Sequence, residues 1–182
     1  MKNGSKTQYA VLGALSIQPM SGYEMKKMMN ESTNYFWSES NGQIYPTLAK
    51  LAKEKYITVE NQLIGSKLKK VYSLSASGKS RLNKWLLEDP EYYPARNELV
   101  LKLFYGQNVL PKTSIGHINK HSERCKQALI VYRDIIDHLE VLVRKKQRPV
   151  YFLVAAMAGI KAVEAELEWC SESIKLINKY TK

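Results

Sequence analysis

The sequence contains little cysteine and no long apolar segment, and each shortage excludes a class of protein. Its two cysteines, Cys125 and Cys170, lie far apart and cannot form a disulfide framework or a zinc ribbon, which fits a reducing cytosol. The longest uncharged run of the C-terminal half, residues 149–160, has 12 residues, whereas a helix needs roughly 18 or more to span a bilayer. No secretory signal is visible. We therefore expect a cytoplasmic protein without a membrane partner.

The sequence also lacks the common catalytic motifs: it has no Walker loop, no nucleophile elbow and no HExxH motif. Its one suggestive cluster is His117, His121 and Cys125, whose spacing places them along one helix face, as metal ligation would need. Basic side chains crowd this face, and Glu123 is the only carboxylate near it in sequence. We therefore expect an ordinary, partly exposed helix surface, with no metal, no cofactor and no catalytic residues. The protein is predicted not to be an enzyme.

Acidic residues are scarce relative to basic ones. The chain has 28 Lys and Arg against 17 Asp and Glu, a net charge of +11 at pH 7. The first 88 residues carry +7 of this charge and the remainder +4. Polyanions are natural partners of such a chain. With 182 residues it can bury a real core, in one domain or in two small ones.

The segment 40–51 predicts a helix whose two faces differ in chemistry. Ile44, Leu48 and Leu51 share one apolar stripe at helical spacing. The opposite face is small, polar and basic, with Gly42, Gln43, Pro46, Ala49, Lys50 and Lys53. Small residues permit close approach, and Gln and Lys side chains can contact base edges and phosphates. Pro46 is expected in the first turn, where its missing N–H costs nothing. The pattern favours a helix that enters a groove of DNA.

The segments around this helix predict a winged helix-turn-helix. A short first helix ends near Pro19, and the S-x-x-E spacing of Ser21 and Glu24 predicts a capping box for a second helix over about residues 22–30. After the groove-facing helix, β-branched and aromatic residues predict strands at 56–60 and 70–74. Helix, helix, helix and hairpin is the order of elements in that fold.

The turn of the predicted hairpin is basic. Gly65 and Ser66 are followed by Lys67, Lys69 and Lys70, which we expect at the tip between the strands. Such lysines alone are typical of a solvated turn, and Gln43 or Lys50 alone of an ordinary helix surface. Together, a basic tip directly after a groove-facing helix indicates a two-point contact with a DNA duplex. The alternative is a winged helix used as a protein-interaction or scaffold module, which has no need of the small helix face or the basic tip.

Five stretches of the chain, in order over about residues 7–106, resemble the PadR family of bacterial transcriptional regulators. They are Tyr9-Ala10-Val11-Leu12-Gly13, Met20-Ser21-Gly22-Tyr23-Glu24, Gly42-Gln43-Ile44-Tyr45-Pro46-Thr47-Leu48, Lys70-Val71-Tyr72-Ser73-Leu74 and Arg96-Asn97-Glu98-Leu99 with Lys102-Leu103-Phe104-Tyr105-Gly106. The remainder, from about Pro111, is similar in length and helical pattern to the C-terminal region of the larger family members. The resemblance implies a homodimeric repressor that a small molecule releases from DNA.

The chain departs from the family pattern at the end of the groove-facing helix. Many family members have a glycine there, whereas this chain continues with Lys55 and Tyr56. The geometry of that helix end is left open, and the expected fold is not affected.

The C-terminal half predicts an antiparallel helical hairpin. The preceding helix, from Ser75 to about Leu87, ends at an acidic stretch with two prolines. We therefore expect a DNA-binding domain at 1–88 and a helical dimerisation and effector domain at 89–182, in a mainly α chain. Apolar residues follow a heptad spacing over 118–143 and again over 153–177, with a turn at 145–149.

Both of these helices carry more apolar residues than one hairpin can bury. The surplus predicts a two-fold homodimer, whose recognition helices would lie roughly 34 to 36 Å apart, or a multiple of that, and whose operator would be palindromic. Counted from the turn, Cys125 and Cys170 come at matching heights. They are expected to be reduced core residues, with a disulfide as the alternative.

The candidate site residues fall into two groups. For binding double-stranded operator DNA we expect Ser21, Tyr23, Gln43, Tyr45, Lys50, Lys67 and Lys69. For a small aromatic or amphipathic effector we expect Trp85, Tyr92, Tyr93 and Tyr105, the aromatic residues around the interdomain stretch.

Overall fold

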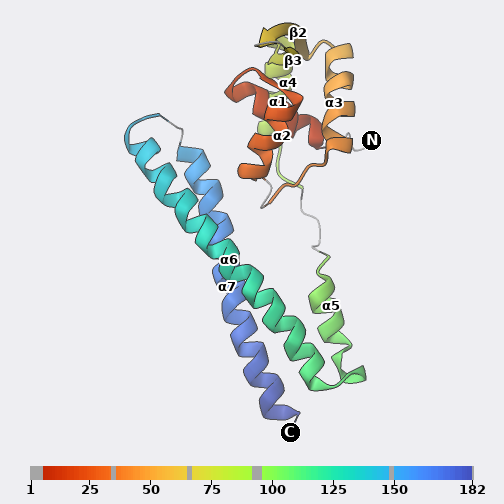
Figure 1. The fold of residues 1–182 in the computed structure, drawn as a ribbon, viewed down its shortest axis with the longest axis vertical. Coiled ribbons are helices and arrows are strands. Elements are labelled where there is room, and N and C mark those ends of the chain that lie inside the picture. The colour runs from red at the N-terminus through yellow and green to blue at the C-terminus, as the bar shows by residue number, and fades with distance from the viewer. Residues whose placement is uncertain (1–5, 34–35, 65–66, 92–95, 148–149, 182) are drawn as a thin grey trace. The chain divides into compact units, whose positions relative to one another are not determined.

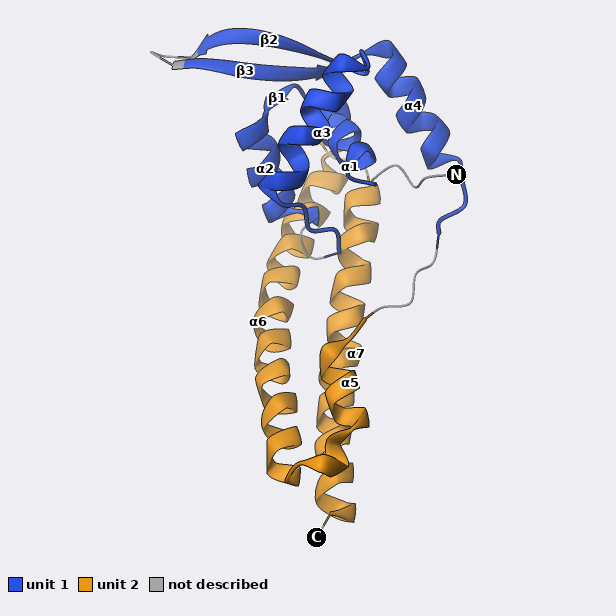
Figure 2. Cartoon of the chain, turned by 90° about the vertical axis from the view of Figure 1, so that its right-hand side faces the viewer, with its two compact units in different colours: residues 1–92 blue, residues 93–182 orange. Residues whose placement is uncertain are grey.

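The computed structural model describes residues 6–33, 36–64, 67–91, 96–147 and 150–181. The chain divides into two compact units, residues 1–92 and 93–182 (Figure 2). Both units are mainly helical, and the first also contains a small sheet (Figure 1). The predicted boundary after residue 88 stays a prediction.

The first unit is a winged helix-turn-helix, as the sequence predicts. Its helices and strands are α1 (Thr7–Ile17), β1 (Met20–Ser21), α2 (Gly22–Glu31), α3 (Asn41–Lys53), β2 (Ile57–Ile64), β3 (Lys67–Leu74) and α4 (Ala76–Leu86). The strands form one antiparallel sheet in the order β1-β3-β2. The short strand β1, which the sequence did not predict, pairs Met20 with Tyr72 and Ser21 with Val71, and so connects the start of α2 to the hairpin.

The predicted apolar stripe of α3 is confirmed as its buried face. Ile44, Leu48 and Leu51 are all 0% exposed and pack in one core with side chains of the other helices, among them Leu12 and Met25. This burial fixes which side of α3 stays outside.

Two details predicted for the first unit are wrong, one in α3 and one in the hairpin of β2 and β3. Pro46 lies inside the helix and not in its first turn, because α3 already begins at Asn41. The carbonyl that its missing N–H would have bonded belongs to Gly42, which is exposed and can be hydrated instead.

The second detail concerns the hairpin. The ladder of β2 and β3 continues through Leu63 and Leu68 to Ile64 and Lys67, so the lysines 67, 69 and 70 belong to strand β3 and not to a turn. The predicted strands, 56–60 and 70–74, are too short because this part of the hairpin is exposed, Leu63 and Leu68 included, and has no buried face to mark it. Gly65 and Ser66 lie outside the described residues.

The C-terminal end of α3 is capped by a motif that here contains no glycine. The N–H of Tyr56 donates to the carbonyl of Leu51 at 2.9 Å, and that of Lys55 to Ala52 at 3.1 Å. This is a Schellman motif, in which the first residue after the C-cap is left-handed. Lys55 is that residue, with φ = 61°.

The second unit is built around an antiparallel helical hairpin, as predicted. It contains α5 (Glu98–Phe104), a short 3₁₀ turn (Gly106–Asn108), α6 (Pro111–Arg144) and α7 (Val150–Tyr180). Helices α6 and α7 lie side by side along most of their length (Figures 1 and 2). Gly159 of α7 makes room for the ring of Tyr132, whose Cε1 atom lies 2.2 Å from the position a Cβ would take. None of the described helices combines the length and the apolar character that crossing a bilayer requires.

Candidate nucleic-acid interface

Helix α3 presents the polar residues that the sequence singled out. Gln43, Tyr45 and Lys50 are all exposed; Gln43 and Lys50 lie on the polar side of the helix, and Tyr45 flanks the buried stripe. The ring of Tyr45 lies against Gly22 of α2, where a Cβ would come within 2.6 Å of its Cε1 atom. The absence of a side chain at Gly22 therefore positions Tyr45. The Nζ atom of Lys50 lies 3.9 Å from Oε1 of Glu54, one helical turn further along, and both side chains are exposed.

The N-terminus of α3 is a second capping box. Both the backbone N–H and the hydroxyl of Ser40 donate to Oε1 of Gln43, at 2.9 and 2.8 Å. Gln43 is therefore both an exposed polar residue and part of the helix cap.

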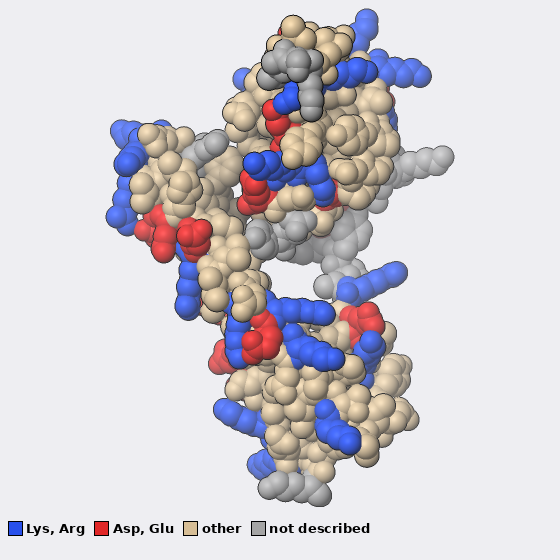
Figure 3. All heavy atoms as spheres, viewed as in Figure 1, with Lys and Arg blue, Asp and Glu red and all other residues tan. Residues whose placement is uncertain are grey.

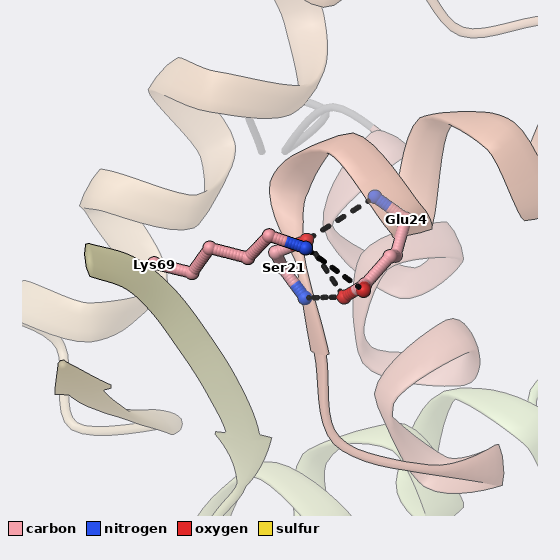
Figure 4. A network of polar contacts seen from close by, with 3 residues as sticks. All are labelled: Ser21, Glu24 and Lys69. Carbon is pink, nitrogen blue, oxygen red and sulfur yellow. Dashed lines mark hydrogen bonds and ion pairs between the residues drawn. The ribbon is translucent and has the colours of Figure 1, made fainter. Parts of the chain in front are cut away.

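The predicted capping box of α2 is confirmed. The N–H and the hydroxyl of Ser21 donate to Oε2 of Glu24 at 2.8 and 2.7 Å, and the N–H of Glu24 donates to the Ser21 hydroxyl at 3.3 Å. Lys69 of β3 reaches the other oxygen of Glu24 at 3.7 Å (Figure 4). The hydrogen bonds from Ser21 lower the pKa of Glu24, and the charge of Lys69 adds to the effect.

These contacts bear on three of the expected DNA-binding residues. Ser21 is buried and its hydroxyl is used in the cap. Lys69 is half-buried and pairs with Glu24, so a phosphate would have to share its charge. Tyr23 is 71% exposed at the start of α2.

The exposed surface of the first unit carries many basic side chains. In Figure 3 they gather at the end of this unit that contains β2 and β3. Lys70 of β3 is exposed. The side chain of Lys67 lies outside what the structure describes.

The expected effector residues are not brought together by the described contacts. Trp85 stacks on Tyr9 with ring centroids 4.5 Å apart and packs against the core of the first unit. Tyr105 belongs to the second unit, where it is exposed and meets Phe104 edge to face. Tyr92 and Tyr93 lie outside the described residues.

His121, from the cluster of His117, His121 and Cys125 on α6, contacts Glu166 of α7, which the sequence spacing did not predict. Nε2 of His121 lies 2.9 Å from Oε2 of Glu166 on α7 and 3.5 Å from Sγ of Cys125. Glu123, the carboxylate near it in sequence, pairs with Lys126 instead. No group of three or more His, Cys, Asp and Glu side chains suited to a metal ion occurs among the described residues.

The two thiols have the character of core residues. Cys125 and Cys170 are free and buried, and burial raises the pKa of both. The negative charge of Glu166 also raises the pKa of both thiols. Both are therefore protonated at neutral pH. The alternative, a disulfide between them, is not tested by the structure.

The two units match two family models. Residues 11–84 match the transcriptional regulator PadR-like family, and residues 95–178 match the virulence activator alpha C-terminal region. Residues 11–84 therefore form a PadR-like domain, and the chain is similar to transcriptional regulators of this family. That family consists of regulators and not of enzymes, in agreement with the lack of catalytic motifs.

Individual relatives agree with this assignment. The PadR-like chain is 39% identical over 100 residues to the negative transcriptional regulator PadR of Bacillus subtilis, a stretch that covers 54% of this chain and 55% of that protein. It is 36% identical over 81 residues to a probable transcriptional regulator of Mycobacterium tuberculosis, covering 44% of this chain and 43% of that one. The matched part thus spans about half the length of these curated relatives.

The structural likeness extends over both units. The crystal structure of Bacillus subtilis PadR in complex with operator DNA has a TM-score of 0.83 and 25% identity, and the match covers 93% of the PadR-like chain and 98% of that one.

Two residues with contacts to the candidate residues, Ser40 and Glu166, were not predicted from the sequence. Ser40 could have been found, because Ser40 and Gln43 have the S-x-x-Q spacing of a capping box. Glu166 carries no such signal, because only the packing of α6 against α7 brings it to His121.

Proposed function

We propose that this chain is a sequence-specific DNA-binding repressor that acts as a homodimer on a palindromic operator and responds to a small molecule. The observation that carries the proposal is α3, which is anchored by three fully buried side chains while Gln43, Tyr45 and Lys50 stay exposed. A recognition helix places its N-terminal residues against base edges in the major groove. A protein that acts on chromosomal operators would be cytoplasmic.

The basic hairpin would supply the second contact. Lys67, Lys69 and Lys70 follow one another along β3, and lysines near phosphates contribute affinity that does not depend on sequence. Bacillus subtilis PadR, the relative named above, is a negative transcriptional regulator with an operator complex, which supports DNA binding and repression for this chain.

The homodimer is supported by exposed apolar side chains on the second unit. None of the residues of α5 is buried, although Val100, Leu101 and Phe104 are apolar. On α7, Val154 and Met157 are exposed one turn apart. Apolar surface of this kind is usually covered by a partner, and a second copy of the chain would cover it with two-fold symmetry.

The effector would be a small aromatic or amphipathic molecule. Bacillus subtilis PadR has also been solved with p-coumaric acid, an aromatic acid. Trp85, Tyr92, Tyr93 and Tyr105 remain our candidates for its contacts. Because Trp emission responds to nearby ligands, titration with a panel of phenolic acids should quench it and release DNA in parallel, and Trp85→Phe should reduce the quenching.

Fluorescence anisotropy tests the DNA-binding proposal. The full chain is titrated against labelled DNA from upstream of its own gene and against a shuffled fragment of the same length, over a series of salt concentrations. The native fragment should bind at least about a thousandfold more tightly at physiological salt. Lys67→Ala should weaken both fragments alike and reduce the salt slope by about one.

Lys84→Ala, which removes an exposed lysine from α4, is the control for loss of charge and should have a smaller effect. Equal affinity of the wild-type chain for native and shuffled DNA would contradict the proposal and favour a scaffold role.

A further inference from the structure

Gln43 occupies the third position of α3, in the turn that would meet base edges first. In protein–DNA complexes a glutamine side chain most often recognises adenine, because its oxygen accepts from the N6 amino group while its nitrogen donates to N7. That pairing requires an amide oxygen with a free lone pair.

The amide oxygen of Gln43 is already used. It accepts the backbone N–H of Ser40 at 2.9 Å and the Ser40 hydroxyl at 2.8 Å. A backbone N–H can only donate, so the atom that faces it must be the oxygen and not the nitrogen of the amide. Two donors occupy both lone pairs of a carbonyl oxygen. What Gln43 has left to offer a base is the NH₂ group, with two donors and no acceptor.

We propose that Gln43 reads DNA as a donor only and selects a guanine, or secondarily a thymine, at the base pair that it faces. Guanine presents two neighbouring acceptors, N7 and O6, in the major groove, and thymine presents O4. Adenine presents its N6 amino group beside N7, so two donors would oppose each other. Cytosine presents only the N4 amino donor. The inference rests on the proposed DNA-binding function and adds to it the base that one residue selects.

Ser40 is therefore a positioning residue for base selection. It holds the amide in one of its two orientations and, through the cap, holds the first turn of α3 in place. The usual preference of glutamine for adenine would return if the oxygen were released.

The test is a base-preference profile. Every base pair of the protected operator fragment is replaced in turn by the other three, and the affinities are measured by competition for the wild-type chain and for Gln43→Glu, Ser40→Ala and Ser21→Ala. Gln43→Glu keeps an oxygen for Ser40, since S-x-x-E is itself a capping box, but replaces the NH₂ donor by an acceptor. A melting curve for each variant checks that it is folded.

The expected result is a guanine or thymine preference of about tenfold or more at one base pair of each half-site of the wild-type operator. Gln43→Glu should abolish this preference at that base pair alone and shift it toward cytosine, whose N4 can donate to the carboxylate. Ser40→Ala should let adenine bind nearly as well as guanine, because it frees one lone pair of the amide oxygen. Ser21→Ala removes the cap of α2 and should leave the preference unchanged.

Three results would overturn the inference. The first is a wild-type preference for adenine at the base pair that Gln43→Glu affects. The second is a folded Gln43→Glu variant whose profile equals that of the wild type. In both cases the chain still discriminates between sequences, so the proposed function survives. The third is a wild-type chain that binds all sequences equally, which overturns the proposed function and this inference together.

Discussion

At the scale of single residues, the carboxylate of Glu24 in α2 contacts Ser21 of β1 and Lys69 of β3. It accepts from Ser21 at the start of α2 and pairs with Lys69 of β3. Its pKa is lowered in the folded chain, first by the Ser21 hydrogen bonds. A lowered folded-state pKa means that the charged group stabilises the fold above the ordinary value of 4.5, and that this contribution is lost as the pH falls through the folded-state pKa.

Glu24→Gln should therefore be less stable than the wild type at pH 7, with a difference that shrinks as the pH falls below about 4.5. Urea unfolding at pH 7 and at steps down to pH 3 measures it. Glu31→Gln, which removes another charge from α2, is the control for net charge. A difference between wild type and Glu24→Gln that stays constant down to pH 3 would contradict the role given to this carboxylate.

Gly78 is a residue at which any side chain should destabilise the fold. A Cβ there would lie 2.0 Å from the backbone oxygen of Tyr56, and backbone cannot move aside as a side chain can. Gly78→Ala should cost about 1–3 kcal/mol of unfolding free energy or more. Gly22→Ala should cost less, because the nearest atoms belong to the half-exposed ring of Tyr45, and the Cδ1 atom of buried Leu48 lies farther away at 3.3 Å.

Gly13→Ala is the matched control, because it lies within α1 and a Cβ there meets no atom within 4 Å. It should be neutral or stabilising by up to about 1 kcal/mol. Thermal or urea unfolding of the three variants decides the order, and an unchanged stability of Gly78→Ala would show that α4 does not pack on Tyr56 as described.

At the scale of elements, two helices end in the same strained way. Lys55 after α3 and Lys146 after α6 both have left-handed backbone, with φ of 61° and 55°. Each closes a Schellman motif, in which glycine is the usual residue. Lys55→Gly and Lys146→Gly should each stabilise the chain by up to about 1 kcal/mol, because the strain exceeds the entropy that glycine loses on folding.

Lys53→Gly is the control for this pair, because Lys53 is the last residue of α3 proper. It should destabilise by roughly 0.5–1 kcal/mol. Chemical unfolding of all three variants is the measurement. If Lys55→Gly and Lys53→Gly proved equally destabilising, the Schellman ends would be wrong.

Elements were predictable from sequence wherever one local pattern determines them. The apolar spacing of Ile44, Leu48 and Leu51 identified the buried face of α3, and the S-x-x-E spacing of Ser21 and Glu24 gave the start of α2. The predictions that failed concern features set by contacts between segments that are distant in the sequence or by strand pairing. The strand ends next to the hairpin turn are exposed, Leu63 and Leu68 included, so no buried face marks them as strands. The pairing of Leu63 with Leu68 and of their neighbours is what places the lysines in β3.

The candidate site was predictable to a similar degree. The exposure of Gln43, Tyr45 and Lys50 follows from the helical period. Contacts between elements could not be predicted in this way, because Lys69 reaches Glu24 only when β3 lies beside the start of α2, and Glu166 reaches His121 only in the packed hairpin of α6 and α7.

At the scale of the whole molecule, the account depends on the second unit forming a dimer. Val154→Glu with Met157→Glu places two charges on exposed apolar positions of α7. Because a buried unpaired charge is costly, this double variant should be monomeric at micromolar concentration in sedimentation velocity while the wild type is dimeric. Operator affinity should fall with it, since one half-site is then bound alone.

Lys175→Glu changes the charge of an exposed residue of the same helix and is the control, expected to stay dimeric. A wild-type chain that is monomeric at this concentration and still binds a palindrome tightly would contradict the dimer.

The measurement that tests the central claim most directly is nuclease protection of the DNA upstream of the gene for this chain. A two-fold dimer with one recognition helix in each copy should protect two inverted half-sites. Their centres should lie about 10–10.5 base pairs apart, or a multiple of this, as one turn of the double helix dictates. The Val154→Glu, Met157→Glu variant should lose this protection at the same concentration. Uniform cleavage along the fragment at concentrations that saturate wild-type binding would contradict the account, and so would a single protected half-site without an inverted repeat.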